Sequence, residues 1–190
     1  MKKKASKITT LLLVCVLIFS SLTGCVSGGE ASDASVKPKL INALNTKDYD
    51  SYLELAYPPY RADIEAEKEK LGYSDEEYMQ YLQDTYFPFD ENSMIAESAT
   101  TLTAAKEFDA EQLSWINDQF IYYDDYLEIT SAQNVTILVR DQKYSDSDAP
   151  AFYEMDIMIV ETEGTYFFAY FKISDEPYDE STPETTTVEE

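Results

Sequence analysis

The hydrophobic positions of this chain recur at two different spacings, and the change falls near residue 124. Before it, apolar residues recur every three or four positions, as on one face of a helix. After it, apolar and polar residues alternate, as in strands with one buried face. The first pattern predicts helices that begin near residues 38, 48, 61, 74 and 109, and the second predicts strands over 134–140, 153–159 and 166–173.

The predicted helices have recognisable ends. Asp48 suits the N-cap of a helix, which Pro58-Pro59 then stops, and Gly72 suits the end of a charged helix over 61–71. Ser74 and Glu77 form a capping box, as do Asp109 and Gln112. In each of these two helices an apolar residue before the cap is expected to contact one in the first turns, and the predicted pairs are Tyr73 with Tyr78 and Phe108 with Leu113.

The three predicted strands form an antiparallel meander. Residues 145–150 and 161–164 are rich in turn formers and suit hairpin connections. Ser93 to Lys106 is rich in threonine and is interpreted as a further strand, with a helix as the alternative. In the last strand, one face is expected to carry Phe167, Ala169, Phe171 and Ile173, and the other Tyr166, Phe168, Tyr170 and Lys172. A sheet with one more polar face needs helices on the other face, so the pattern predicts an α+β fold in which helices cover a curved antiparallel sheet.

Residues 1–24 have the three zones of an export signal. Four lysines precede the uninterrupted apolar run Leu11–Phe19, and small residues then lead to Cys25. A membrane helix needs about 20 apolar residues, so this run is too short to span a bilayer. The alternative, a buried core helix, would usually show a polar face, which the run lacks.

Leu22-Thr23-Gly24-Cys25 resembles the lipobox of bacterial lipoproteins. The resemblance implies that the Cys25 sulfur receives a diacylglycerol, that the chain is cut before Cys25, and that the new N-terminus is acylated, for example with palmitate. Two or more acyl chains suffice for stable anchoring. We therefore expect a lipid-anchored protein on the extracytoplasmic side of the cell membrane. Because Cys15 lies in the removed segment, no disulfide is expected in the mature domain.

The formal charge narrows the possible partners. Removal of residues 1–24 leaves ten basic and 37 acidic residues, a charge of −27. Such a charge argues against nucleic acid, whose phosphates need Lys and Arg, and against contact with an anionic leaflet. Cations and basic peptides are compatible partners, although a strongly negative surface that only maintains solubility is the simpler interpretation.

The predicted organisation has four parts. Residues 1–24 are the signal peptide, and 25–36 (rich in Gly, Ser and Ala) form a flexible tether. Residues 37–174 form one α+β domain, and the acidic tail 175–190 has too few apolar residues to fold.

Two segments resemble the cystatin-like and nuclear-transport-factor-like (SnoaL-like) domains found in exported Firmicutes lipoproteins. The first segment is Asn42–Pro58, the opening helix pair. The second consists of the capped helix at Asp109 and the closing strands, which end in Thr165–Phe171. Similarity to this family implies a curved sheet wrapped by helices around a cone-shaped cavity that is either open to a small molecule or filled. Enzymes of the family commonly place His, Asp or Arg inside the cone, and this chain contains no His.

No motif in the sequence indicates catalysis. Nucleophilic triads usually need a His base, whereas paired carboxylates stay possible among 37 acidic residues. Asp124-Asp125 and Asp146-Ser147-Asp148 are the obvious acidic clusters, and the second lacks the Gly and later Glu of an EF-hand, so turn formation is the simpler role for both. Asn134-Val135-Thr136 matches a glycosylation sequon but is interpreted as coincidental. A tyrosine-rich cavity that stacks sugars is the alternative to core packing for Tyr52, Tyr57, Tyr60, Tyr78, Tyr81, Tyr86, Trp115 and Tyr170.

Three functions are compatible with these features. The first is a lipid-anchored binding or accessory protein of the bacterial envelope that is not an enzyme, needs no cofactor or metal, and binds a small molecule, peptide or protein. The second is an enzyme that uses a carboxylate inside the cone, near Tyr or Arg140. The third is a structural envelope lipoprotein with a filled core.

Overall fold

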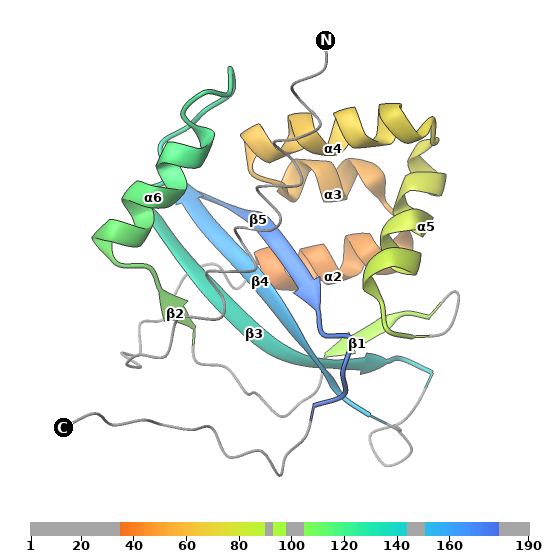
Figure 1. Cartoon of the computed structure of the whole chain (residues 1–190). Helices are drawn as coiled ribbons and strands as arrows, with labels where there is room; N and C mark the ends of the chain where they lie inside the picture. The colour runs from red at the N-terminus through yellow and green to blue at the C-terminus, as the bar shows by residue number, and fades with distance from the viewer. Residues whose placement is uncertain (1–34, 90–92, 98–104, 144–150, 179–190) are drawn as a thin grey trace, which may run out of the picture. The chain divides into compact units, whose positions relative to one another are not determined.

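The computed structural model describes residues 35–89, 93–97, 105–143 and 151–178, and these form an α+β arrangement (Figure 1). In chain order the elements are α2 (Val36–Thr46), α3 (Tyr49–Leu55), α4 (Pro58–Leu71), α5 (Asp75–Tyr86), β1 (Ile95–Glu97), β2 (Lys106–Glu107), α6 (Ala110–Phe120), β3 (Ser131–Asp141), β4 (Tyr153–Thr162) and β5 (Thr165–Ile173). The predicted α+β class and the antiparallel meander are confirmed. The predicted signal peptide, most of the tether, the 145–150 connection and most of the acidic tail lie outside the described residues.

The sheet is open and antiparallel. Its strand order is β1-β3-β4-β5, and β2 lies beside β3 along the same edge as β1. The segment interpreted as one strand, Ser93 to Lys106, contributes the short strands β1 and β2. The residues between them, 98–104, lie outside the described part of the chain. A turn at Glu163-Gly164, both with positive φ, connects β4 to β5, as the hairpin prediction requires.

The first four helices pack against one face of the sheet. Figure 1 shows α2, α3, α4 and α5 grouped together, with α6 separate from them near the start of β3. The main hydrophobic cluster joins Leu40, Leu44, Tyr52 and other residues of these helices to alternate residues of the strands. The strand residues in this cluster include Val135, Ile137, Val139, Met155, Ile157, Ile159, Phe168, Phe171 and Ile173.

The helix ends follow the local sequence. The carboxylate of Asp48 accepts a hydrogen bond from the backbone N–H of Ser51, which caps α3. Pro58-Pro59 occupies the first turn of α4, where a missing N–H and a fixed φ favour the helix. The prediction that α4 begins near residue 61 was therefore wrong by one turn. Gly72, with φ +71°, ends α4 as expected.

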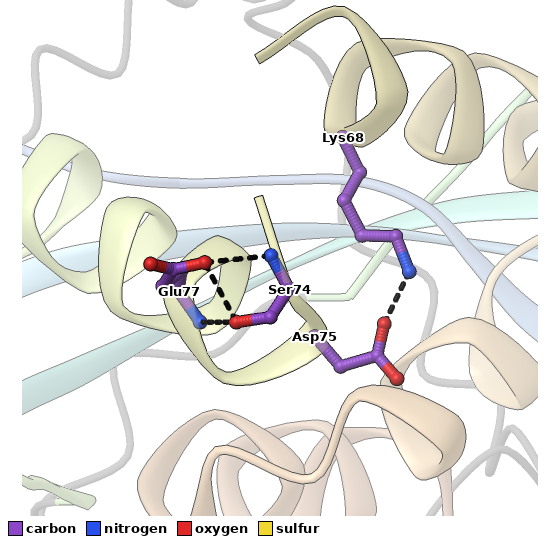
Figure 2. A network of polar contacts seen from close by, with 4 residues as sticks. All are labelled: Lys68, Ser74, Asp75 and Glu77. Atoms are coloured by element: carbon purple, nitrogen blue, oxygen red, sulfur yellow. Dashed lines mark hydrogen bonds and ion pairs between the residues drawn. The ribbon is translucent and has the colours of Figure 1, made fainter. Parts of the chain in front are cut away.

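The connection between α4 and α5 is held by side chains at its two ends (Figure 2). The predicted capping box is confirmed: Ser74 Oγ accepts from Glu77 N at 3.3 Å, and Glu77 Oε2 accepts from Ser74 N at 2.8 Å. Lys68 of α4 donates to Asp75 of α5. The ring of Tyr73 packs on that of Tyr81, with the two ring centroids 5.8 Å apart.

A β-bulge in the β4–β5 pair changes the faces of β5. Met158 pairs with Tyr170 and Ile159 pairs with Phe168, so β5 has one extra residue at this point. Phe171 and Phe168 consequently both enter the main hydrophobic cluster. The strict alternation predicted for residues 166–173 was wrong on the N-terminal side of this bulge.

Candidate binding site

The face of the sheet opposite the main hydrophobic cluster carries a group of polar side chains, here called the polar face. On β3, Asn134 and Thr136 alternate with cluster residues and therefore point to this face. Thr136 pairs with Asp156 of β4, which pairs in turn with Lys172 of β5. The polar face is defined by Asn134, Thr136, Asp156 and Lys172.

Asp156 is the carboxyl group at the centre of the polar face. Thr136 Oγ1 donates a hydrogen bond to its Oδ1 at 2.5 Å. Burial raises the pKa of Asp156, while the Thr136 hydroxyl and the ammonium of Lys172 act in the opposite direction. Because burial is the largest effect, the ionised carboxylate is stabilised less here than in water.

Asn134 is a buried amide two residues before Thr136 on the same face of β3. Its side chain is 8% exposed, and within the part of the chain that the structure describes Asn134 Oδ1 accepts no hydrogen bond. A buried acceptor without a donor costs about 1–3 kcal/mol. Its cross-strand neighbours are Met158 on β4 and Lys106 on β2, whose pKa is lowered by burial. A group that donates a hydrogen bond to Asn134 would therefore be favoured at this position.

Apolar side chains surround the polar face. Leu138, Met158 and Tyr170 lie on the same side of the sheet by their pairing, and all three are buried. Thr136 and Asp156 are half-buried and Lys172 is exposed, so water screens the interactions among these groups only in part. The arrangement can hold a proton on Asp156, or bind a cationic or hydroxyl-bearing group, more readily than an exposed carboxylate can.

The aromatic residues singled out in the sequence mostly form the core. Tyr52 and Tyr78 are buried within the main hydrophobic cluster, and Tyr60, Tyr81 and Tyr86 pack against it. Burial raises the pKa of Tyr52, Tyr78 and Tyr86, so their hydroxyls stay protonated at neutral pH. The Tyr78 hydroxyl donates to Glu67 Oε2 at 2.9 Å. Core packing is thus confirmed for these five residues.

The other aromatic residues of that set lie outside the main cluster. Tyr57 is fully buried, and its hydroxyl donates to the carbonyl oxygen of Leu127. Burial raises the pKa of Tyr57 to about 12. Tyr170 is buried and lies on the same side of the sheet as the polar face. Trp115 is half-buried on α6.

The structure describes only some of the acidic and basic residues that the sequence singled out. Asp124 and Asp125 are exposed in the turn after α6. Over residues 35–89, 93–97, 105–143 and 151–178, no three His, Cys, Asp or Glu side chains lie close enough together to hold a metal ion. Asp146-Ser147-Asp148 and Cys25 lie outside the described residues. Arg140 is half-buried on β3, on the same side of the sheet as Thr136.

The sequence reasoning did not identify Asn134 and Asp156 as members of one site. The available signal was their position: each is a polar residue within a strand that is otherwise mostly apolar, and each alternates with core residues. The register that brings Thr136 opposite Asp156 depends on strand pairing, which the sequence pattern does not specify.

Comparisons with known proteins add no further assignment. No protein-family model matches this chain, and neither the curated proteins nor the solved structures include a significant match to it. None of the helices within the described residues is long and apolar enough to cross a membrane.

Proposed function

We propose that this chain is a lipid-anchored, extracytoplasmic binding or accessory protein of the bacterial envelope. The observation that carries the proposal is Leu22-Thr23-Gly24-Cys25 directly behind the apolar run Leu11–Phe19. This order places a nucleophilic thiol among small residues at the end of an export signal. The lipid would hold the protein at the membrane, and no helix of the domain is needed for that purpose.

The fold supports this proposal in two ways. The first described helix begins at Val36, the last residue of the predicted tether, so residues 25–35 would form a short tether between the anchor and the domain. Helices against one face of an antiparallel sheet are also the arrangement expected of the proposed cystatin-like cone. In that proposal the polar face with Asn134 and Asp156 is the first candidate for ligand binding.

Replacement of the anchor residue tests the proposal directly. In a bacterium that expresses the full chain, the wild type is expected to incorporate a labelled fatty acid and to sediment with membranes. Cys25→Ser is expected to lose the label completely and to accumulate as precursor or as released protein, whereas Cys15→Ser should behave as wild type. Labelling of Cys25→Ser at the wild-type level would refute lipidation at this residue.

The alternative function is an enzyme that uses a carboxylate. Asp156 is the residue that favours it, because burial raises its pKa and Thr136 holds its side chain in one orientation. Such a group keeps its proton to a higher pH than an exposed aspartate does, and can donate that proton to a bound molecule. A purely structural role is the third candidate, and the aromatic core around Tyr52 and Tyr78 supports it.

A further inference from the structure

The turn after α6 exposes two large hydrophobic side chains. Tyr122 is 86% exposed and Ile121 is 53% exposed, the highest values among the large hydrophobic residues that the structure describes. The chain between α6 and β3 extends as a loop beyond the sheet (Figure 1). Ile121 and Tyr122 are here called the α6 tip. Exposed aromatic side chains of this kind are common at protein interfaces.

The residues next to the α6 tip are fixed to the rest of the domain. Phe120 is buried, with its ring 5.1 Å from Tyr57 and 5.7 Å from Tyr123. The Tyr123 hydroxyl donates to Asp63 Oδ2 on α4 at 2.8 Å, and Tyr123 N donates to Phe120 O at 2.9 Å. The α6 tip is therefore flanked by Phe120 and Tyr123, whose rings pack against each other and whose contacts reach α4 and Tyr57.

A second set of contacts fixes the far side of the loop. The Tyr126 hydroxyl donates to Asn117 Oδ1 at 3.0 Å, and Ile129 N donates to the same oxygen at 2.8 Å. Asn117 Nδ2 donates in return to Ile129 O at 3.0 Å. Because these contacts order the loop before binding, the loop loses little conformational entropy when a partner docks there.

The sequence on both sides of the α6 tip is acidic. Asp118, Asp124, Asp125 and Glu128 are all exposed, and the sequence contains no Lys or Arg from residue 107 to 139. Burial raises the pKa of Tyr126, and the negative charges of Glu128 and Asp118 add to this increase. An aromatic ring with carboxylates around it is complementary to a cation, which interacts with the ring face and the carboxylates together.

We propose that the α6 tip docks an arginine-rich segment of a partner protein. The inference rests on the proposed function as a binding protein and specifies its partner. A guanidinium group stacks on a tyrosine ring and forms paired hydrogen bonds with carboxylates, whereas an ammonium group cannot form both contacts equally well. An anionic membrane surface and a second copy of this acidic chain would both be repelled by the same carboxylates.

The test uses the full-length lipidated protein in detergent micelles and a short peptide of alternating arginine and glycine with blocked termini. Its matched probe has citrulline, the neutral analogue, in place of arginine. The wild type is expected to bind the arginine peptide and not the citrulline peptide in calorimetry. Tyr122→Ser is expected to weaken binding about fivefold, which corresponds to one exposed cation–aromatic contact.

Tyr73→Ser provides the matched control. Tyr73 is 38% exposed and precedes the acidic residues Asp75, Glu76 and Glu77, but it is remote in sequence from the α6 tip. Its removal should leave the affinity unchanged within a factor of two, and Tyr122→Ser should melt at the wild-type temperature. Equal affinities for wild type and Tyr122→Ser would overturn the proposal, because general acidity would then explain the binding.

Two further outcomes would also overturn it. One is an absence of arginine-peptide binding, and the other is concentration-dependent self-association that Tyr122→Ser abolishes, which would identify a second copy as the occupant. The proposed anchoring is separate from these results, since fatty-acid labelling at Cys25 is measured independently of the peptide.

Discussion

Asp156 is the residue with the most unusual environment in the sheet. Its carboxyl group lies in the middle of β4, between Thr136 and Lys172, with an apolar neighbour on each side along the strand. An apolar residue at this position would cost less free energy, since burial disfavours the ionised form. A polar group retained at a position where it destabilises the fold is a common property of functional sites.

The raised pKa of Asp156 predicts a pH dependence of stability. The folded pKa lies above the ordinary value of 3.8, so the folded protein binds the proton more tightly than the unfolded chain does. The contribution of this group to the free energy of unfolding is therefore fully present below pH 3.8 and is lost as the pH rises through the folded pKa. At neutral pH the carboxylate is destabilising.

Asp156→Asn should therefore stabilise the protein at pH 7. The amide keeps an acceptor for the Thr136 hydroxyl and removes the half-buried charge. Urea unfolding is expected to show a larger free energy of unfolding for the variant at pH 7, with a difference that shrinks as the pH is lowered toward 4. The exposed control Asp175→Asn should show no such change. A variant that is less stable at pH 7 would contradict the assignment.

Among the helices, α6 is the one whose start is specified most completely by hydrogen bonds between neighbouring residues. The Asp109 carboxylate accepts hydrogen bonds from Glu111 N and Gln112 N, both at 2.9 Å, and Gln112 Oε1 accepts from Asp109 N at 2.9 Å. Ile116 and Phe120 form the buried face of the helix, and Leu113 is half-buried. This capping box was predicted from four consecutive residues, and the structure confirms it.

Removal of the α6 cap should have a measurable cost. Asp109→Ala is expected to lower the free energy of unfolding by about 1 kcal/mol, because two backbone N–H groups lose their acceptor. Asp109→Asn should lose much less, since Asn is an equally good N-cap residue. Chemical denaturation of both variants at one pH would measure the difference. Equal losses would mean that the negative charge, and not the cap geometry, is responsible.

At the scale of the whole domain, β5 connects the sheet to the helices. The backbone N–H of Tyr57 donates to the Phe168 carbonyl oxygen at 2.8 Å, which extends the sheet edge at Ala56. Phe168 has no exposed surface, and its ring lies 5.1 Å from Tyr52 and 6.2 Å from Tyr60. The neighbouring Phe167 is only half-buried, under the guanidinium of Arg61.

The two phenylalanines should differ strongly in their contribution to stability. Phe168→Ala is expected to lower the free energy of unfolding by about 3–5 kcal/mol, since it leaves a cavity in the core. Phe167→Ala is expected to cost about 1 kcal/mol, as a partly exposed side chain does. Denaturant unfolding of the two variants tests the β-bulge directly. The opposite order would mean that β5 keeps the strict alternation that the sequence suggests.

Local sequence specifies the features that depend on neighbouring residues. The caps at Asp48, Ser74 and Asp109 and the left-handed residue Gly72 each require partners within four positions, so their hydrogen bonds are specified locally. The change of hydrophobic period near residue 124 likewise identified the α+β class and the three long strands β3, β4 and β5.

Tertiary packing determines which residues of neighbouring strands pair with each other. The β-bulge that turns Phe168 inward depends on its fit against Tyr52 and Tyr60, residues more than a hundred positions away. The pairing of Thr136 with Asp156 depends on the same strand register. The exposure of Tyr122 depends on contacts that bury its neighbours, such as that of Tyr123 with Asp63. Such contacts join distant parts of the chain, and a local pattern does not encode them because their free energy comes from packing after the elements have formed.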